Sequence, residues 1–219
     1  MIGSRSLSRN RTARLAAVLI LGTLYTMIRM GTGLPAAHAS ASSEGPTCHG
    51  FTATIVGTPG DDTIYGTPGR DVIVGEGGDD DIHGRSGNDV ICGNRGADDL
   101  FGGKGADEIS GGDGSDTLDG GDGNDDLQGD DGIDDLQGED GDDDLQGDAG
   151  DDTLEGGSGA DDLEGNQGDD DLQGDNGDDT LDGGAGDDVE DGGNGDDSAV
   201  CVVSAVEVDD CQGNEDIQS

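Results

Sequence analysis

Aspartate recurs at a fixed place in a nine-residue repeat, and its spacing from glycine suits the binding of a hard cation. Sixteen consecutive units run from Gly57 to Val200 without insertion or deletion, each with Gly at places one and four and Asp at place six. Ca²⁺ prefers six to eight carboxylate and carbonyl oxygens. Two loops, each supplying one carboxylate and its carbonyls, provide such a set, whereas Mg²⁺ demands a tighter octahedron and keeps its water.

The candidate metal ligands are the sixteen aspartates at place six. They are Asp62, Asp71, Asp80, Asp89, Asp98, Asp107, Asp116, Asp125, Asp134, Asp143, Asp152, Asp161, Asp170, Asp179, Asp188 and Asp197. We expect those from Asp80 to Asp179 to bind most strongly, since each would have folded loops on both sides. Asp188 and Asp197 are weaker candidates, because the aliphatic pattern fails around them. Softer metals find no cluster of Cys and His at ligand spacing.

The elements that must position these aspartates are short strands. Place eight is Ile or Leu in the first fourteen units, from Ile64 to Leu181, and no other place is systematically apolar. Side chains alternate along a strand, so the residues that flank the aliphatic one face water. The period therefore predicts coils of three-residue strands and six-residue turns, stacked about 4.8 Å apart as parallel strands around two ladders of Ile and Leu.

The pattern resembles GGxGxDxUx, with U a large aliphatic residue, the nonapeptide of the repeats-in-toxin (RTX, hemolysin-type) calcium-binding family. The resemblance covers 144 of 219 residues. It implies an all-β fold, a right-handed parallel β-roll (β-helix solenoid) with two nonapeptides per coil. It also implies Ca²⁺ between loops on the same side, repeat n against repeat n+2, with the place-six carboxylate and loop carbonyls as ligands. Sixteen loops, eight per side, then leave seven gaps per side and at most 14 sites.

Charge predicts that the chain depends on its metal. Residues 105–219 contain 42 Asp and Glu and no Lys or Arg. Stacked loops place carboxylate above carboxylate, and a core of one aliphatic side chain per unit is sparse, so we expect the calcium-free chain to be expanded and disordered. Each site needs its neighbouring loop, which predicts a cooperative transition. Half-saturation should fall at about 10⁻⁴ to 10⁻³ M, the range of extracellular calcium modules.

Residues 1–39 have the features of a secretory signal peptide. Four arginines precede an apolar run over residues 15–28, and Ala37-His38-Ala39 is a small-x-small cleavage site. Cleavage is expected after Ala39, or else after Ala41. The alternative is a permanent membrane anchor, for which fourteen apolar residues are short. We expect the mature protein to be secreted, extracellular and monomeric.

The segments beside the repeats are expected to be caps. Residues 40–56 would form an N-terminal cap, in which Ile55 falls nine before Ile64, residues 57–200 the sixteen repeats, and residues 201–219 a C-terminal cap and tail. The four cysteines, all in the exported part, favour two disulfides. Three connectivities are open; we favour Cys48 with Cys92 and Cys201 with Cys211, the alternative being that some thiols stay free.

Composition narrows the function classes. Without residues 1–39 the chain has four basic residues against 53 acidic ones, which excludes nucleic acid and anionic membrane as partners. The segments outside the repeats are too small for a catalytic domain, and His83 is expected on the surface, so we expect no enzyme. The favoured function is calcium binding. The alternative is an adhesive extracellular rod stiffened by calcium and attached to the cell envelope or a surface; a disordered spacer and an ice-binding roll fit the pattern less well.

Overall fold

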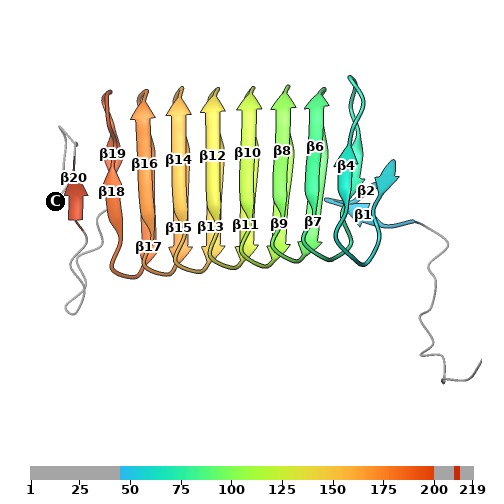
Figure 1. Ribbon diagram of the computed structural model, residues 1–219. Helices are drawn as coiled ribbons and strands as arrows, with labels where there is room; N and C mark the ends of the chain where they lie inside the picture. The colour runs from blue at the N-terminus through green and yellow to red at the C-terminus, as the bar shows by residue number, and fades with distance from the viewer. Residues whose placement is uncertain (1–44, 200–209, 213–219) are drawn as a thin grey trace, which may run out of the picture. The chain divides into compact units, whose positions relative to one another are not determined.

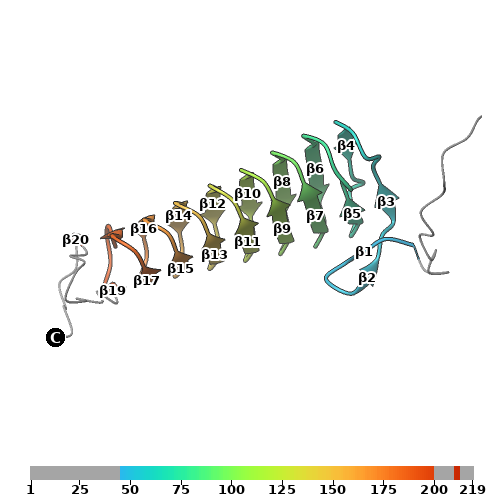
Figure 2. The same cartoon turned by 90° about the horizontal axis from the view of Figure 1, so that it is seen from below.

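The computed structural model describes residues 45–199 and 210–212, and in them the repeats form two parallel sheets (Figures 1 and 2). Successive units alternate between the sheets, so that two units complete one coil. Strands of neighbouring coils pair in parallel at a separation of 18 residues, as in Leu118 opposite Leu136. The all-β, parallel β-roll with two nonapeptides per coil is therefore confirmed. The described residues include no helix long and apolar enough to cross a membrane.

Within the described residues, each of these two parallel sheets has nine strands. The first contains, in spatial order, β4 (Thr63–Tyr65), β6 (Asp81–Ser86), β8 (Asp99–Lys104), β10 (Thr117–Asp122), β12 (Asp135–Asp140), β14 (Thr153–Ser158), β16 (Asp171–Asn176), β18 (Val189–Asp191) and β20 (Asp210–Gln212). The second contains β3 (Ile55–Val56), β5 (Val72–Val74), β7 (Val90–Arg95), β9 (Glu108–Asp113), β11 (Asp126–Asp131), β13 (Asp144–Ala149), β15 (Asp162–Gln167), β17 (Thr180–Ala185) and β19 (Ser198–Ala199).

The strands are longer than the sequence predicts. From β6 to β17 each has six residues, running from place seven of one unit to place three of the next, which leaves three-residue turns. The prediction of three-residue strands and six-residue turns was wrong for these units and holds only for strands such as β4 and β5. The reason is that pairing between coils continues beyond the aliphatic residue. The Gly132 N–H, for example, donates to the Ala149 carbonyl one coil further on (2.8 Å).

The core is the predicted set of aliphatic residues at place eight. All fourteen, from Ile64 to Leu181, are buried in one continuous cluster, with Ile55 packed against its end. Burial alternates along strands such as β11, in which place seven faces solvent while place eight and the following Gly face inward. The interior therefore contains Leu or Ile from each of the first fourteen units, with Gly beside it.

The inward register persists where the aliphatic residue is lost. Glu190 stands at place eight of its unit, pairs in register with Leu172 and is 1% exposed, whereas Val189 is 40% exposed. The Gly183 N–H donates to Glu190 Oε1 (2.8 Å). Backbone pairing along the strand thus determines which residue faces inward, even when that residue is a carboxylic acid.

A short hairpin covers the outer face of the second sheet near its start. It consists of β1 (Thr47–Cys48) and β2 (Phe51–Thr52), and the predicted disulfide joins Cys48 to Cys92 with the Cα atoms 5.8 Å apart. Val72, Val74 and Val90 are buried under it. The sequence analysis predicted the disulfide but missed the burial of these three valines under the hairpin. The signal was present, because places seven and nine face outward and are rarely apolar in other units.

Parts of the predicted domain division lie outside the described residues. These are residues 1–39, assigned to a signal peptide, and most of residues 201–219, assigned to a C-terminal cap and tail. The predicted Cys201–Cys211 disulfide also lies outside the side chains that the structure describes. At the N-terminal end, β3 pairs with β5, placing Ile55 opposite Ile73.

Candidate metal centres

The turns bring the place-six aspartates into two interior rows, one at the end of each sheet. Each turn is Gly-x-Asp, and its Asp faces inward because it precedes the aliphatic residue by two places. Fifteen of the sixteen candidates, from Asp71 to Asp197, are 1–6% exposed. Asp62, in the first unit, is only partly buried. The structure thus gathers into buried rows the carboxylates that the sequence selected.

One oxygen of each carboxylate links neighbouring coils. Asp134 Oδ1 accepts a hydrogen bond from the Asp116 N–H (2.8 Å), and the Asp134 N–H donates to Asp152 Oδ1 (2.8 Å). Fourteen such bonds, at 2.7–3.1 Å, run from Asp62 to Asp197. The rows therefore hold like charges one coil apart, where they repel one another unless a cation or proton intervenes.

The other carboxylate oxygen is buried without a partner in most units. Oδ2 accepts no hydrogen bond, within the described part of the chain, in Asp80, Asp89, Asp98, Asp107, Asp116, Asp125, Asp134, Asp143, Asp152, Asp161, Asp170, Asp179 and Asp197. A buried carboxylate oxygen without a hydrogen bond is costly, and its regular recurrence is the pattern expected of cation ligands. Calcium, a hard cation that binds oxygen, satisfies this need.

The glycine at place one leaves room for that oxygen. A Cβ on Gly129 would lie 2.5 Å from Asp134 Oδ2 of its own unit and 2.9 Å from the Gly147 carbonyl oxygen of the next coil. A carboxylate oxygen and a backbone carbonyl thus converge beside the glycine, in a space that any other residue would fill. This donor set, built from units n and n+2, fits Ca²⁺.

The glycine at place four permits close stacking of the turns. A Cβ on Gly132 would lie 1.7 Å from the carbonyl oxygen of Gly114, in the turn one coil earlier. No side chain fits at that distance. Place one, and place four from the second coil onward, therefore require glycine for lack of space.

Place two has a recurrent backbone conformation that the sequence analysis missed. In each of the fourteen units from Gly75 onward, the residue at place two has a positive φ of 68–113°. Six of these residues are Gly and five are Asn or Asp, the types that tolerate this region best. That bias at place two was the available signal. Units one and two, with Thr58 and Thr67 there, do not share this geometry.

Burial raises the pKa of the place-six aspartates from Asp80 to Asp179. The pKa of Asp125 is raised to about 7, mainly by desolvation; a hydrogen bond from the Asp107 backbone opposes the rise, and the nearby carboxylates of Asp107 and Asp143 add to it. Asp116 also rises to about 7. The pKa rises to about 6, mainly through desolvation, in Asp98, Asp107, Asp134, Asp161, Asp170 and Asp179. Without a cation, protonation is therefore the alternative way to neutralise the rows.

This predicts that acid promotes folding of the calcium-free chain. A carboxyl whose folded pKa is raised contributes stability below its unfolded value of 3.8, and this is lost as pH rises through about 6 to 7. In chelator, the far-UV circular dichroism signal of β structure should grow as pH falls from about 7.5 to about 4. Size-exclusion chromatography controls for aggregation. A signal that is constant, or that grows with rising pH, would contradict this expectation.

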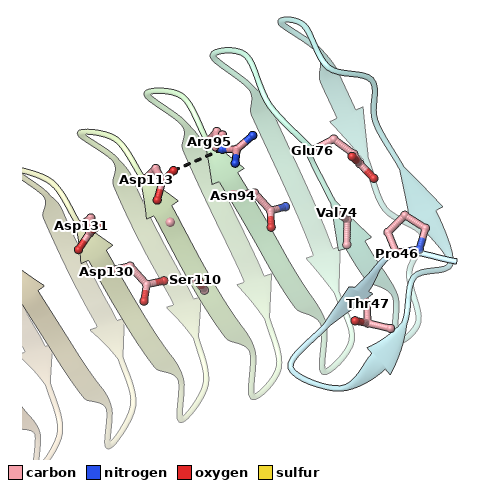
Figure 3. A pocket seen from close by; sticks show the side chains of 11 residues that line it. Pro46, Thr47, Val74, Glu76, Asn94, Arg95, Ser110, Asp113, Asp130 and Asp131 are labelled. Atoms are coloured by element: carbon pink, nitrogen blue, oxygen red, sulfur yellow. Dashed lines mark hydrogen bonds and ion pairs between the residues drawn. The ribbon is translucent and has the colours of Figure 1, made fainter. Parts of the chain in front are cut away.

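A groove beside the hairpin is separate from these rows (Figure 3). It lies on the outer face of the second sheet and is lined by outward-facing residues that include Glu76, Asp113 and Asp130. Arg95 Nε lies 3.4 Å from Asp113 Oδ2, and Ser110 Oγ donates to Asp130 Oδ2 (2.6 Å). Two of the carboxylates that line the groove therefore have side-chain partners within the protein, Arg95 and Ser110, whereas the buried Oδ2 atoms of the turns from Asp80 to Asp179 have no hydrogen-bond partner.

The histidines take structural positions. His83 is stacked between the rings of Tyr65 and Phe101, with centroids 5.0 and 4.7 Å away, on the outer face of the first sheet. His49 lies near Cys48 and Cys92, but both sulfur atoms are bonded to each other. Neither histidine joins the rows of aspartates.

The fold and its rows of acidic turns define a class of repeat protein, the parallel β-solenoid with oxygen-rich turns. The model of the RTX calcium-binding nonapeptide repeat matches the chain in four copies, at residues 56–91, 93–127, 128–163 and 164–199. These cover more than half of the 219 residues, so the chain belongs to the RTX calcium-binding repeat family. None of the curated proteins compared with the chain matches it.

Membership of this family implies calcium binding. The RTX β-roll is a structural calcium-binding fold that is not typically catalytic, and RTX repeat proteins are typically secreted. The predicted family is thus confirmed.

Proposed function

We propose that this chain is a secreted calcium-binding module whose roll folds cooperatively as Ca²⁺ binds between stacked turns. The observation that carries the proposal is the recurrence of a buried Asp Oδ2 without a hydrogen-bond partner. The place-six aspartates are the proposed ligands, with carbonyls such as that of Gly147, which converges with Asp134 Oδ2 beside Gly129. Calcium supplies the positive charge that cancels the repulsion along each row.

Cooperativity follows from how each site is built. The carboxylate comes from unit n and the carbonyl from unit n+2, so one site requires two adjacent coils to be formed. The same two coils are tied by a hydrogen bond between their aspartates, as from Asp116 N–H to Asp134 Oδ1. Filling one site therefore orders half of the next. The fourteen linked pairs set an upper limit of 14 ions.

Export fits this behaviour. A chain that stays unfolded where calcium is scarce can pass through a translocon, and the expected signal peptide at residues 1–39 would direct it there. Outside the cell, calcium at about 10⁻³ M would then order the roll.

Equilibrium dialysis of the exported chain against ⁴⁵Ca²⁺ tests the proposal. We expect about ten or more ions per chain, with half-saturation at about 10⁻⁴ to 10⁻³ M. Mg²⁺ at the same concentration is the control and should compete weakly, because it does not adopt large, irregular oxygen sites. Binding of no more than one or two calcium ions, or equal binding of magnesium, would refute it.

A further inference from the structure

The first coil differs from the other seven in how its aspartates are satisfied. In unit one, the Thr58 N–H donates to Asp62 Oδ2 (2.6 Å), and the Thr58 hydroxyl lies 2.9 Å from the same oxygen. In unit two, Thr67 makes the same pair of contacts to Asp71 Oδ2, at 2.6 and 3.0 Å. The oxygen that has no hydrogen-bond partner in the turns from Asp80 to Asp179 is therefore doubly hydrogen-bonded here.

The local sequence explains this difference. Both turns read Gly-Thr-Pro-Gly, and no other unit has Thr at place two or Pro at place three. A residue before proline is restricted to extended conformations, so Pro59 and Pro68 keep the threonines out of the positive φ that place two adopts in all later units. Because φ at place two sets the orientation of the preceding peptide, the N–H in these two turns is free to face the carboxylate. The threonine hydroxyl then completes the pair of donors.

We infer that Thr58 and Thr67 replace calcium in the first coil. Two of the fourteen gaps between turns use Asp62 Oδ2 or Asp71 Oδ2, and in both gaps two hydrogen-bond donors already hold the oxygen that calcium would need. Calcium binding there would require breaking both hydrogen bonds, whereas the other twelve gaps, which use Oδ2 of the place-six aspartates from Asp80 to Asp179, each offer an oxygen with no hydrogen-bond partner. The array thus has 12 calcium sites, and its first coil is a metal-independent end.

The neighbourhood of this coil supports a metal-independent role. All four basic residues of the exported part lie between Arg70 and Lys104, near the first coils, so the repulsion that calcium must cancel is weakest there. Arg70 lies over the ring of Phe51, 4.5 Å from its centroid. The Cys48–Cys92 disulfide ties the hairpin to the same end. Cohesion at this end therefore comes from hydrogen bonds, apolar packing and a covalent bond.

This inference rests on the proposed calcium function, and a count of bound ions at saturation tests it separately. Native mass spectrometry and equilibrium dialysis of the exported chain should give 12 calcium ions. A variant in which both turns become Gly-Gly-Asn-Gly, as in the last unit (Thr58→Gly, Pro59→Asn, Thr67→Gly and Pro68→Asn), should bind 14. The matched control, Thr58→Ser with Thr67→Ser, keeps a hydroxyl and both prolines and should bind 12.

The outcomes separate the two ideas. A wild-type count of 14 overturns the inference by itself, whether or not any variant folds, and leaves the calcium function intact. A four-substitution variant that folds with calcium, as judged by circular dichroism, yet still binds 12 ions also overturns it. A wild-type chain that binds no calcium overturns the proposed function itself.

Discussion

Removing calcium at pH 7.5 should unfold the β-roll. At free calcium ten times the dissociation constant, each site adds about 1.4 kcal/mol to the stability, so ten sites together add about 14 kcal/mol. That sum equals the whole stability of an ordinary domain. The core contains only one aliphatic side chain per unit. Burial of this core cannot replace the stability that calcium supplies while the carboxylates within each row repel one another. Far-UV circular dichroism should change from a β to an unordered spectrum on addition of chelator.

The transition should also be steep and reversible. Because each site spans two coils, a titration with Ca²⁺ should give a Hill coefficient well above one, and small-angle scattering should show the chain contracting over the same range. Magnesium at equal concentration serves as the control and should leave the chain expanded. A compact chain with a β spectrum in chelator at this pH would rule out calcium as the main source of cohesion.

Replacing Asp125 by Ala should have a much larger effect than replacing its neighbour Asp126. Asp125 is 3% exposed, accepts a hydrogen bond from the Asp107 N–H (2.7 Å) through Oδ1, and leaves Oδ2 unpartnered. Its loss removes one carboxylate that two gaps share. We expect one or two fewer bound ions, a higher calcium midpoint and lower cooperativity, with each lost site costing about 1.4 kcal/mol at tenfold excess.

Asp126 is the matched control for this substitution. It is adjacent in sequence, has the same charge, and lies at the exposed place seven of β11. Asp126→Ala should leave the ion count unchanged and alter the stability by no more than about 0.5 kcal/mol. Calcium titrations followed by circular dichroism and by isothermal calorimetry compare the two variants. Equal effects of the two substitutions would contradict the inward orientation of place six.

The nonapeptide repeat by itself predicts most of the fold. A single aliphatic place in each nonapeptide, with exposed neighbours, is enough to predict which side chains face inward, and Leu127 and its equivalents do so. The pairing of each coil with the next followed from the family resemblance and is confirmed by the 18-residue register. The all-β parallel architecture was thus accessible from pattern alone.

What the pattern did not reveal depends on contacts between coils. The length of the strands is set by backbone hydrogen bonds between coils, such as that from the Gly132 N–H to the Ala149 carbonyl. Such bonds cannot be predicted from the types of the residues that make them. The role of glycine at place one became clear only when Asp134 Oδ2 was seen to lie where a Cβ would be. Side-chain composition identifies which atoms can bind a metal, but only the stacking of turns shows which of those atoms have another partner.

Two further features were visible in the sequence but were not interpreted. The outward-facing Val72, Val74 and Val90 signalled that something covers the second sheet, and the hairpin around Cys48 does so. The threonines at place two, Thr58 and Thr67, stand out in the repeat, but the pattern alone gives them no role. Their significance depends on the hydrogen bonds to Asp62 and Asp71, and these required atomic positions.

The 18-residue register has a consequence for how such an array can change in length. Every strand pairs with its counterpart 18 residues away, so gain or loss of a block of that size adds or removes one complete layer and leaves all other pairings as they were. Gain or loss of a block of nine residues would instead move every downstream strand from its own sheet to the other one. Tyr65, His83 and Phe101, for instance, stack because they share one sheet. Unequal recombination between the DNA segments that encode such 18-residue blocks can therefore lengthen the array by whole coils without loss of the fold.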